Sequence, residues 1–376
     1  DLMSIAESEL IFVGFQGMID PPRKEVKNAI KLCNDAGIKV LMMTGDSKLT
    51  AEAIAEDIGL KGDSVGVAEL HSMSNVDLLK RIDDISVFSR ITPEDKLRII
   101  NILKKKNEIV AMTGDGVNDA LALKRADIGI AMGIRGTDVA RDSSDIVLID
   151  DNFASIVEGV REGRTIYDNV KKFVKYLLSA NFSEVVLVLI VMLIWRDARF
   201  LPLLPLQILW INLITDSLPA LALSSEKMED DVMKRAPSGE GILKGIKSFI
   251  FVAGLIAVLI GFLFFYMNKG DMDYARTMVV SSSIVFEMFL VFNCRNNGFV
   301  FSNGGFFGGL KKGIFGNKYL IYAVLVSIGL HVFAIYSPLG GLFGFVRLEL
   351  MDWVWLVGVG LVGFVGVEVF KGLNRG

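Results

Sequence analysis

Six long apolar segments, all in the last 205 residues of this 376-residue chain, restrict its fold more than any other feature. A helix that crosses a lipid bilayer needs about 20 mainly apolar residues. The sequence supplies such segments at 173–195, 201–223, 248–268, 276–294, 319–338 and 351–370. We therefore expect an α-helical membrane domain of six spans. A single water-soluble domain, a disordered chain and a coiled coil are excluded.

The charged residues are concentrated before these segments. Residues 1–171 carry 22 Lys and Arg against 29 Asp and Glu, a net charge of −7, whereas residues 172–376 carry 18 against 14, a net charge of +4. The first part therefore has the composition of a soluble, acidic domain, and we expect a soluble domain over 1–160 and a transmembrane domain over 161–376. The overall charge of −3 argues against a nucleic-acid partner.

The loops between the apolar segments predict the orientation in the bilayer. Most loop Lys and Arg residues lie in 224–247, in 295–318 and in the C-terminal tail. An even number of spans places these loops on the same side as residues 1–160. Because cytoplasmic loops carry an excess of Lys and Arg, we expect a multi-pass membrane protein whose soluble part is cytoplasmic.

Three acids, Glu184, Asp216 and Glu287, lie well inside the apolar segments. An ionised side chain is costly in hydrocarbon, so a functional role is the default expectation. The alternative is a protonated acid that is hydrogen-bonded to a neighbouring helix. Lys175 and Glu368 lie near the ends of their segments, where we expect them to extend to the membrane surface.

Polar residues accompany two of these acids at helical spacing: Asn181 with Glu184, and Asn212 and Thr215 with Asp216. Pro219 lacks a backbone donor and should loosen the helix near residue 215, which frees carbonyl oxygens. Carboxylate, amide, hydroxyl and backbone oxygens together are the ligands of a hard cation such as Ca²⁺. No Cys or His cluster accompanies them, so a soft-metal site is not expected.

Short apolar runs alternate with helical patterns in the soluble part. The predicted strands are 11–15, 39–43, 87–90, 109–113, 128–132 and 146–149. The predicted helices are 22–36, 48–58, 93–106, 119–126 and 137–142. This alternation is typical of an α/β fold, a parallel sheet with helices on both faces, in which ligands bind at the carboxyl ends of the strands.

Two of these strands end in the same tripeptide. Thr44-Gly45-Asp46 follows one, and Thr113-Gly114-Asp115 follows another and continues to Asn118 and Asp119. Glycine lets the backbone N–H groups approach a phosphate oxygen. Asp115 has the character of a Mg²⁺ ligand, with Asp119 as its support. Lys96 offers a positive charge for phosphate. A surface turn and a solvated lysine are the alternatives for Thr44–Asp46 and Lys96 taken alone.

The longer strings resemble P-type ATPases over essentially the whole chain. They are GMIDPPRKEV (17–26), MTGDSKLTAEAIA (43–55), TGDGVNDALALKRADIGIAMG (113–133) and DDNFASIVEGVREGRTIYDNVKKF (150–173). SANFSEVV (179–186), LQILWINLITDSLPALAL (206–223) and SSSIVFEMF (281–289) resemble the sarco/endoplasmic reticulum-type calcium pumps and their prokaryotic relatives.

The resemblance implies a HAD-like phosphorylation domain, Mg²⁺ and ATP as cofactors, and transport of Ca²⁺ driven by an aspartyl phosphate. It also assigns roles to individual residues. Those implied around the phosphoryl group are Thr44, Gly45 and Asp46 at the phosphate, Lys96 at the phosphoryl oxygens, Asp115 on Mg²⁺, Asn118 and Asp119 in support, and Asp20 in the hinge motif. Those implied for calcium are Asn181, Glu184, Thr215, Asp216 and Glu287 in one site, and Asn212 and Asp216 in a second.

The sequence also departs from the family pattern. It contains no DKTGT-like string, which in the family holds the phosphorylated aspartate, and no segment that matches the nucleotide-binding or actuator domain. We therefore expect the C-terminal half of a pump that is inactive alone, with the N-terminal half, in the same or a separate chain, as its partner and as the location of most of the ATP site. The alternatives are a Na⁺ or H⁺ pump and a non-catalytic membrane subunit or remnant.

Overall fold

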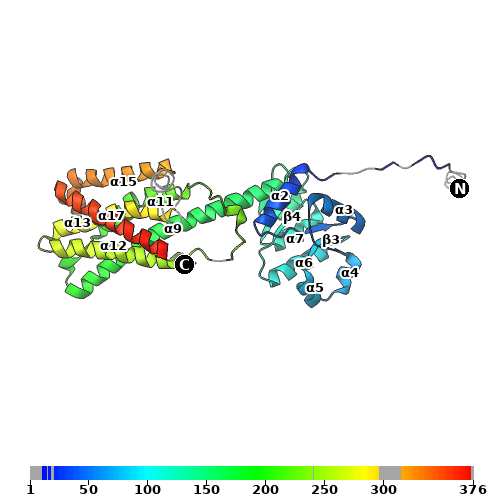
Figure 1. Cartoon of the computed structure of the whole chain (residues 1–376), viewed down its shortest axis with the longest axis horizontal. Coiled ribbons are helices and arrows are strands. Elements are labelled where there is room, and N and C mark those ends of the chain that lie inside the picture. The colour runs from blue at the N-terminus through cyan, green and yellow to red at the C-terminus, as the bar shows by residue number, and fades with distance from the viewer. Residues whose placement is uncertain (1–10, 15, 18–20, 240, 296–314, 374–376) are drawn as a thin grey trace. The chain divides into compact units, whose positions relative to one another are not determined.

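The computed structural model describes residues 11–14, 16–17, 21–239, 241–295 and 315–373, and the chain divides into two compact units. The first unit comprises Asp1–Arg161 and Met233–Pro237. The second, which we call the helical unit, comprises Glu162–Val232 and Ser238–Gly376. Figure 1 shows the strands in the first unit and the long helices in the second.

The first unit contains two parallel sheets of three strands each. One has the order β1-β3-β2, with β1 at Met42–Thr44, β2 at Asp63–Gly66 and β3 at Ile85–Ser89. The other has the order β4-β5-β6, with β4 at Ala111–Gly114, β5 at Ile128–Met132 and β6 at Ile146–Leu148. The expected α/β fold with parallel strands is confirmed, although the strands form two ladders and include β2, which the sequence analysis missed.

The strand predicted at 11–15 was wrong. In its described part, residues 11–14, the backbone forms no strand, and Ile11 and Val13 are 86% and 95% exposed. An apolar run becomes a strand only where the edge of another strand pairs with it. The described strands offer this segment no such pairing.

Helices connect the strands of the first unit (Figure 1). They are α2 (Lys24–Asp35), α3 (Lys48–Ile58), α4 (Val67–Ser72), α5 (Asn75–Arg81), α6 (Pro93–Lys105), the 3-10 turn η1 (Val117–Asp119), α7 (Ala120–Arg125) and α8 (Asp138–Asp142). Most of these begin within two residues of the helices that the sequence predicts, and α4 and α5 are additional.

The start of α6 illustrates how local sequence defines these helices. Pro93 occupies its first turn, and Thr92 and Asp95 form a capping box with bonds of 3.0 and 3.3 Å. Asp95 also contacts Nε2 of His71 at 2.8 Å. Burial raises the pKa of the Asp95 carboxyl, but the hydrogen bonds from Thr92 and His71 outweigh it, so the pKa lies below its usual value.

Two apolar cores hold the sheets of the first unit together. One gathers around Ile85 and Phe88 of β3, and the other around Met112 of β4 and Ile100 of α6. Met43 of β1 packs against both cores. Side-chain packing, and not a shared ladder, therefore joins the two sheets that end in the TGD tripeptides.

The described residues include six helices that are long and apolar enough to cross a membrane. They are α9 (Phe153–Trp195), the segment Ala198–Ser224, α12 (Lys247–Asn268), α13 (Met272–Cys294), α15 (Lys318–Tyr336) and α17 (Leu350–Leu373). Shorter elements are η2 (Ala198–Phe200), α10 (Pro205–Trp210), the π turn η3 (Ile211–Thr215), α11 (Ser217–Ser224), η4 (Val232–Lys234) and α16 (Gly340–Phe343). The six expected spans are confirmed as helices.

α13 is the central helix of the helical unit. It packs against α11, α12, α15 and α17, and its apolar window is more buried than that of any other described span. Figure 1 shows α12, α13 and α17 running side by side. Side chains on α13 are therefore largely enclosed by other helices, and Glu287 is only 1% exposed.

Two charged residues that we expected at the membrane surface face the interior instead. Lys175 is 3% exposed, with its Nζ atom over the Phe249 ring at 4.6 Å from the centroid. Glu368 is 5% exposed and contacts Nζ of Lys371 at 2.6 Å. The prediction was wrong because position along a span does not reveal which face of the helix meets its neighbours.

Candidate functional site

The first TGD tripeptide forms a tight turn at the carboxyl end of β1. Thr44 Oγ1 accepts a hydrogen bond from the Asp46 amide at 3.0 Å and donates to Asp46 Oδ2 at 3.0 Å. The Asp46 carbonyl accepts from the Arg90 amide at 3.1 Å, which ties the turn to the residue after β3. Gly45 is exposed, and a Cβ there would meet nothing within 4 Å. The turn is thus preformed and open to an anion.

The second TGD continues into a turn organised by Asp119. Oδ2 of Asp119 accepts hydrogen bonds from the amides of Asp115 and Gly116 at 3.3 and 3.2 Å. Its Oδ1 accepts from Nζ of Lys96, on α6, at 2.6 Å. The side chains of Lys96 and Asp119 are 16% and 9% exposed. Gly114 is required here, because a Cβ would lie 2.4 Å from Cβ of Asp119.

Asp115 and Asn118 lie on the exposed side of this turn. In the described part of the chain, the Asp115 carboxylate makes no hydrogen bond or ion pair, whereas its backbone is fixed by Asp119 and by the Thr137 amide, which donates to the Asp115 carbonyl at 2.8 Å. An exposed carboxylate on a fixed backbone, beside a bound lysine, suits Mg²⁺, which takes one or two carboxylates and keeps several waters. The residues therefore fit the magnesium role implied for Asp115.

The loop after β5 contacts this turn through the Thr137 amide, and Asp151 holds that loop in place. The sequence analysis did not single out Asp151. Its carboxylate accepts hydrogen bonds from the amides of Ile134 and Arg135 at 3.0 and 2.8 Å. Burial raises the pKa of Asp151, but the backbone N–H groups outweigh it and the pKa lies below its usual value. Asp20, the acid of the hinge motif, lies outside the described residues.

The helix that contains Asp216 is loosened where Pro219 predicts it. Residues Ile211–Thr215 form a π turn between α10 and α11. The Thr215 carbonyl, which would bond to the amide that Pro219 lacks, accepts instead from Oγ of Ser327, on α15, at 2.9 Å. π turns in helices are frequently found at functional sites.

The three acids of the helical unit come from three helices. Glu184 lies on α9, Asp216 between η3 and α11, and Glu287 on α13, and all three are at most 4% exposed. Nδ2 of Asn212 donates to Oε2 of Glu184 at 2.9 Å, and Oη of Tyr176 donates to Oδ1 of Asp216 at 2.9 Å. The carboxyls of Glu287 and Asp216 lie within hydrogen-bond reach of each other, and Glu184 lies close enough to interact with the charge of Glu287.

Several carboxylate oxygens of this group are buried and receive no hydrogen bond from an N–H group or a hydroxyl group of the described residues. They are Oε1 of Glu184, Oδ2 of Asp216, and both Oε atoms of Glu287. A buried polar atom without a partner is costly, and such atoms in a native fold require an explanation. A cation held between the helices would supply partners to some of these oxygens, with amide, hydroxyl or carbonyl oxygens completing its coordination.

The remaining predicted ligands lie on the same helices but face their own backbone. Nδ2 of Asn181 donates to the Leu177 carbonyl, and Oγ1 of Thr215 donates to the Ile211 carbonyl, both at 2.9 Å. No group of three or more His, Cys, Asp or Glu side chains in the described ranges lies close enough to hold a metal ion. A complete ion site would therefore need amide, hydroxyl and carbonyl oxygens in addition to the acids.

The sequence analysis missed two residues that contact this site, Tyr176 and Ser327. Tyr176 is fully buried, and it is the described hydrogen-bond donor to Asp216. A tyrosine beside a lysine inside an apolar span was the available signal, because both side chains need polar partners there. Ser327 has no such signal, since a lone serine in a span usually bonds to its own helix.

Comparison with protein families gives two matches that follow one another along the chain. A model of haloacid dehalogenase-like hydrolases matches residues 6–127, and a model of the C-terminus of cation transporting ATPases matches residues 200–373. The chain belongs to the P-type cation-transporting ATPases. With its six apolar helices, this membership makes it an integral membrane protein.

Individual cation-transporting ATPases are similar over nearly the whole chain. The calcium-transporting ATPase of Bacillus subtilis is 43% identical over 96% of the chain. The endoplasmic reticulum-type calcium-transporting ATPase 3 of Arabidopsis thaliana is 37% identical over 98%, and a cation-transporting ATPase of Synechocystis is 41% identical over 87%. The aligned residues make up 40%, 40% and 37% of these proteins, so the chain spans about two fifths of the curated relatives it matches.

Proposed function

We propose that this chain is the C-terminal part of an ATP-driven pump that transports Ca²⁺. The observation that carries the proposal is the set of buried carboxylate oxygens on Glu184, Asp216 and Glu287 that receive no hydrogen bond from an N–H or hydroxyl group. Buried acids on three neighbouring helices give a hard cation the anionic oxygens it requires. The names of the relatives from Bacillus subtilis and Arabidopsis thaliana support calcium as that cation.

In the proposed reaction, the first unit holds the phosphoryl group and the helical unit holds the ion. The Thr44–Asp46 turn offers backbone N–H groups and a hydroxyl to phosphate oxygens, and Lys96, fixed by Asp119, neutralises their charge. Asp115 would hold Mg²⁺, which supplies further charge neutralisation when bound. Asn118 is exposed on the same turn and would offer a polar side chain next to Asp115.

The phosphorylated aspartate is proposed to come from the N-terminal part of the pump, since this sequence has no DKTGT-like string. That part would also supply the actuator domain and most of the ATP site. Residues 1–160 would then complete a phosphorylation domain on the cytoplasmic side, and 161–376 would form the transmembrane domain in the bilayer. The Lys- and Arg-rich loops support this orientation. By this proposal the chain is inactive alone.

The test is formation of the phosphoenzyme from ATP by the chain joined to its own N-terminal part. We expect phosphorylation to require Ca²⁺, and Asp216→Asn to abolish that requirement or to raise the Ca²⁺ concentration needed by at least about tenfold, which is 1.4 kcal/mol. Asp273→Asn is the matched control, because Asp273 is an exposed acid at the start of α13. Unchanged Ca²⁺ dependence in Asp216→Asn would show that the ion site is wrongly assigned.

The same phosphorylation assay tests two alternative functions. The relative from Synechocystis is named only as a cation-transporting ATPase, and carboxylates and amides also suit a pump for Na⁺ or H⁺. A pump for Na⁺ or H⁺ would be favoured if phosphorylation required Na⁺ or low pH and did not depend on Ca²⁺. Glu287→Gln should then abolish the dependence on Na⁺ or pH. Absence of any phosphoenzyme from the joined protein would favour a non-catalytic membrane subunit.

A further inference from the structure

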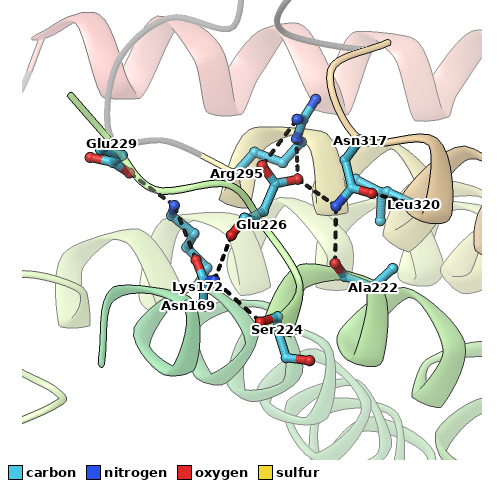
Figure 2. Close-up of polar contacts among 9 residues, drawn as sticks. All are labelled: Asn169, Lys172, Ala222, Ser224, Glu226, Glu229, Arg295, Asn317 and Leu320. Atoms are coloured by element: carbon cyan, nitrogen blue, oxygen red, sulfur yellow. Dashed lines mark hydrogen bonds and ion pairs between the residues drawn. The ribbon is translucent and has the colours of Figure 1, made fainter. Parts of the chain in front are cut away.

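A cluster of buried polar side chains surrounds the end of α11, away from the acids described above. We call it the α11-end cluster, and Figure 2 shows its contacts. Its members come from α9, from the chain after α11, from the end of α13 and from the start of α15: Asn169, Lys172, Glu226, Arg295 and Asn317. The exposed fraction of each is below a tenth, which is unusual for the charged members.

The centre of the cluster is an ion pair between Glu226 and Arg295. Nε of Arg295 donates to Oε1 of Glu226 at 2.8 Å, and its terminal nitrogen donates to Oε2 at 3.0 Å. The side chains are 9% and 8% exposed. A two-pronged contact of this kind fixes direction as well as distance. Breaking a buried ion pair by removing one partner is strongly destabilising, so the two groups depend on each other.

The same cluster caps the carbonyl groups at the end of α11 (Figure 2). Nδ2 of Asn317 donates to the Ala222 carbonyl at 3.0 Å and to Oε1 of Glu226 at 2.8 Å. Nδ2 of Asn169 donates to the Ser224 and Glu226 carbonyls at 3.2 and 2.9 Å. The last carbonyls of a helix have no partner within the helix. Here α9 and α15 supply those partners.

The other end of α11 is held by the same two helices. Tyr176 of α9 donates to Asp216, and Ser327 of α15 donates to the Thr215 carbonyl. Arg295 joins Glu226, which follows α11, to the end of α13. Glu287 lies eight residues before Arg295, about 12 Å along the helix at 1.5 Å per residue. One rigid helix therefore carries both the acid and the arginine.

We propose that the Glu226–Arg295 ion pair sets the spacing between Asp216 and Glu287, and that both of its members are positioning residues for the ion site. The pair fixes the end of α11 to the end of α13. Asp216 directly precedes α11 and Glu287 lies on α13, so a shift at the pair changes the distance between the two acids. The function of these acids as ion ligands rests on the proposal of the preceding section, whereas the spacing itself does not.

The first experiment measures Ca²⁺-dependent phosphorylation of the joined pump in Glu226→Gln, Arg295→Lys and the swapped pair Glu226→Arg with Arg295→Glu. A positioning role predicts that each single variant raises the Ca²⁺ concentration for half-maximal phosphorylation by about tenfold while the maximal level stays unchanged. We expect the swapped pair to recover most of the affinity, because it restores the contact between the two elements.

Asp273→Asn is the control for this series. It removes an ion pair with Arg276 on the same helix, α13, at its opposite end, where the Asp273 side chain is 64% exposed. We expect its half-maximal Ca²⁺ concentration to equal that of the unmodified pump. Single variants of Glu226 and Arg295 that match this control would overturn the proposal, as would equal losses in maximal level and affinity.

The second experiment uses the chain alone and does not depend on calcium transport. Asp216→Cys and Glu287→Cys place two thiols at the acid positions, with Cys33→Ser and Cys294→Ser removing the two natural thiols. Two thiolates bind Cd²⁺ tightly only at the correct spacing. We expect Glu226→Gln to weaken Cd²⁺ binding by about tenfold in this background.

The two experiments separate the two proposals. Equal Cd²⁺ affinity with and without Glu226→Gln would overturn the positioning role, whatever the pump transports. Absence of Ca²⁺-dependent phosphorylation in the unmodified joined pump would overturn the calcium assignment, and the Cd²⁺ measurement would still decide whether the ion pair sets the spacing of the acids.

Discussion

Replacing Asp119 tests whether this side chain organises the turn that follows β4. Asp119→Ala removes three hydrogen bonds, from Lys96 at 2.6 Å and from the amides of Asp115 and Gly116 at 3.3 and 3.2 Å. Each backbone bond contributes about 1 kcal/mol and the charge-assisted bond about 2 kcal/mol. Because the Lys96 side chain is 16% exposed, water partly replaces the lost contact, and we expect a total of about 3 kcal/mol.

Hydrogen exchange of the full chain in lipid nanodiscs measures this loss directly. A loss of about 3 kcal/mol corresponds to roughly a hundredfold faster exchange of the amides in β4 and α7, if these elements open together with the turn. Asp119→Asn retains an oxygen for the two backbone amides and loses only the ion pair, so we expect about 1–2 kcal/mol for it. Comparing the two variants would separate the contribution of the backbone hydrogen bonds from that of the ion pair with Lys96.

Asp115→Ala is the matched control, because Asp115 lies four residues earlier on the same turn and its carboxylate makes no contact in the described residues. We expect exchange within a factor of about 2 of the unmodified chain, since exposed substitutions change stability by less than about 0.5 kcal/mol. In the joined pump, the same variant should lose Mg²⁺-dependent phosphorylation. The reasoning is refuted if Asp119→Ala and Asp115→Ala exchange at the same rate.

Three further predictions concern other parts of the chain. The pKa of Asp95 lies below its usual value, so its contribution to stability is present above about pH 4 and is lost as the pH falls through the lowered pKa. Asp95→Asn should therefore make the free energy of unfolding, followed by circular dichroism, depend less steeply on pH below about pH 4. Pro219→Ala restores an amide donor to the π turn and should raise the half-maximal Ca²⁺ concentration of the joined pump about fivefold; an unchanged value would argue against a role for the loosened turn. Gly254→Ala brings a Cβ to 2.4 Å from the Phe182 ring and should cost about 1–3 kcal/mol in thermal unfolding, whereas Gly329→Ala, where nothing lies within 4 Å, should cost little.

The sequence predicts the strands of the first unit best where an apolar run ends in a turn residue. The strand predicted at 128–132 has the bounds of β5, and the one predicted at 109–113 overlaps β4 and ends at its TGD turn. β2 was missed because Asp63–Gly66 contains a single apolar β-branched residue, Val65, and so gives no apolar run. The run at 11–15 was misleading because pairing, which the sequence does not encode locally, decides whether such a run forms a strand.

The acids of the helical unit were visible in the sequence because a charge inside an apolar span stands out against its neighbours. Their partners were not visible. Tyr176 lies 40 residues before Asp216, and Arg295 lies 69 residues after Glu226. Such pairs form only when the helices pack, so local spacing cannot reveal them. The buried position of Lys175 was missed for the same reason.

The loosened turn at Ile211–Thr215 links the stability of the helical unit to its proposed function. A helix that gives up backbone hydrogen bonds inside a membrane must satisfy the freed groups through side chains of other helices. Ser327 does this at the Thr215 carbonyl, at the start of α11, and Asn317 does the same at its end. These bonds make the oxygens near Asp216 part of the packing between helices. A bound cation would then compete with, or replace, contacts that hold α11 in place, and its binding would change how α11 meets its neighbours. The segment that offers oxygens to the ion is thus the segment whose position depends on polar contacts from α9 and α15.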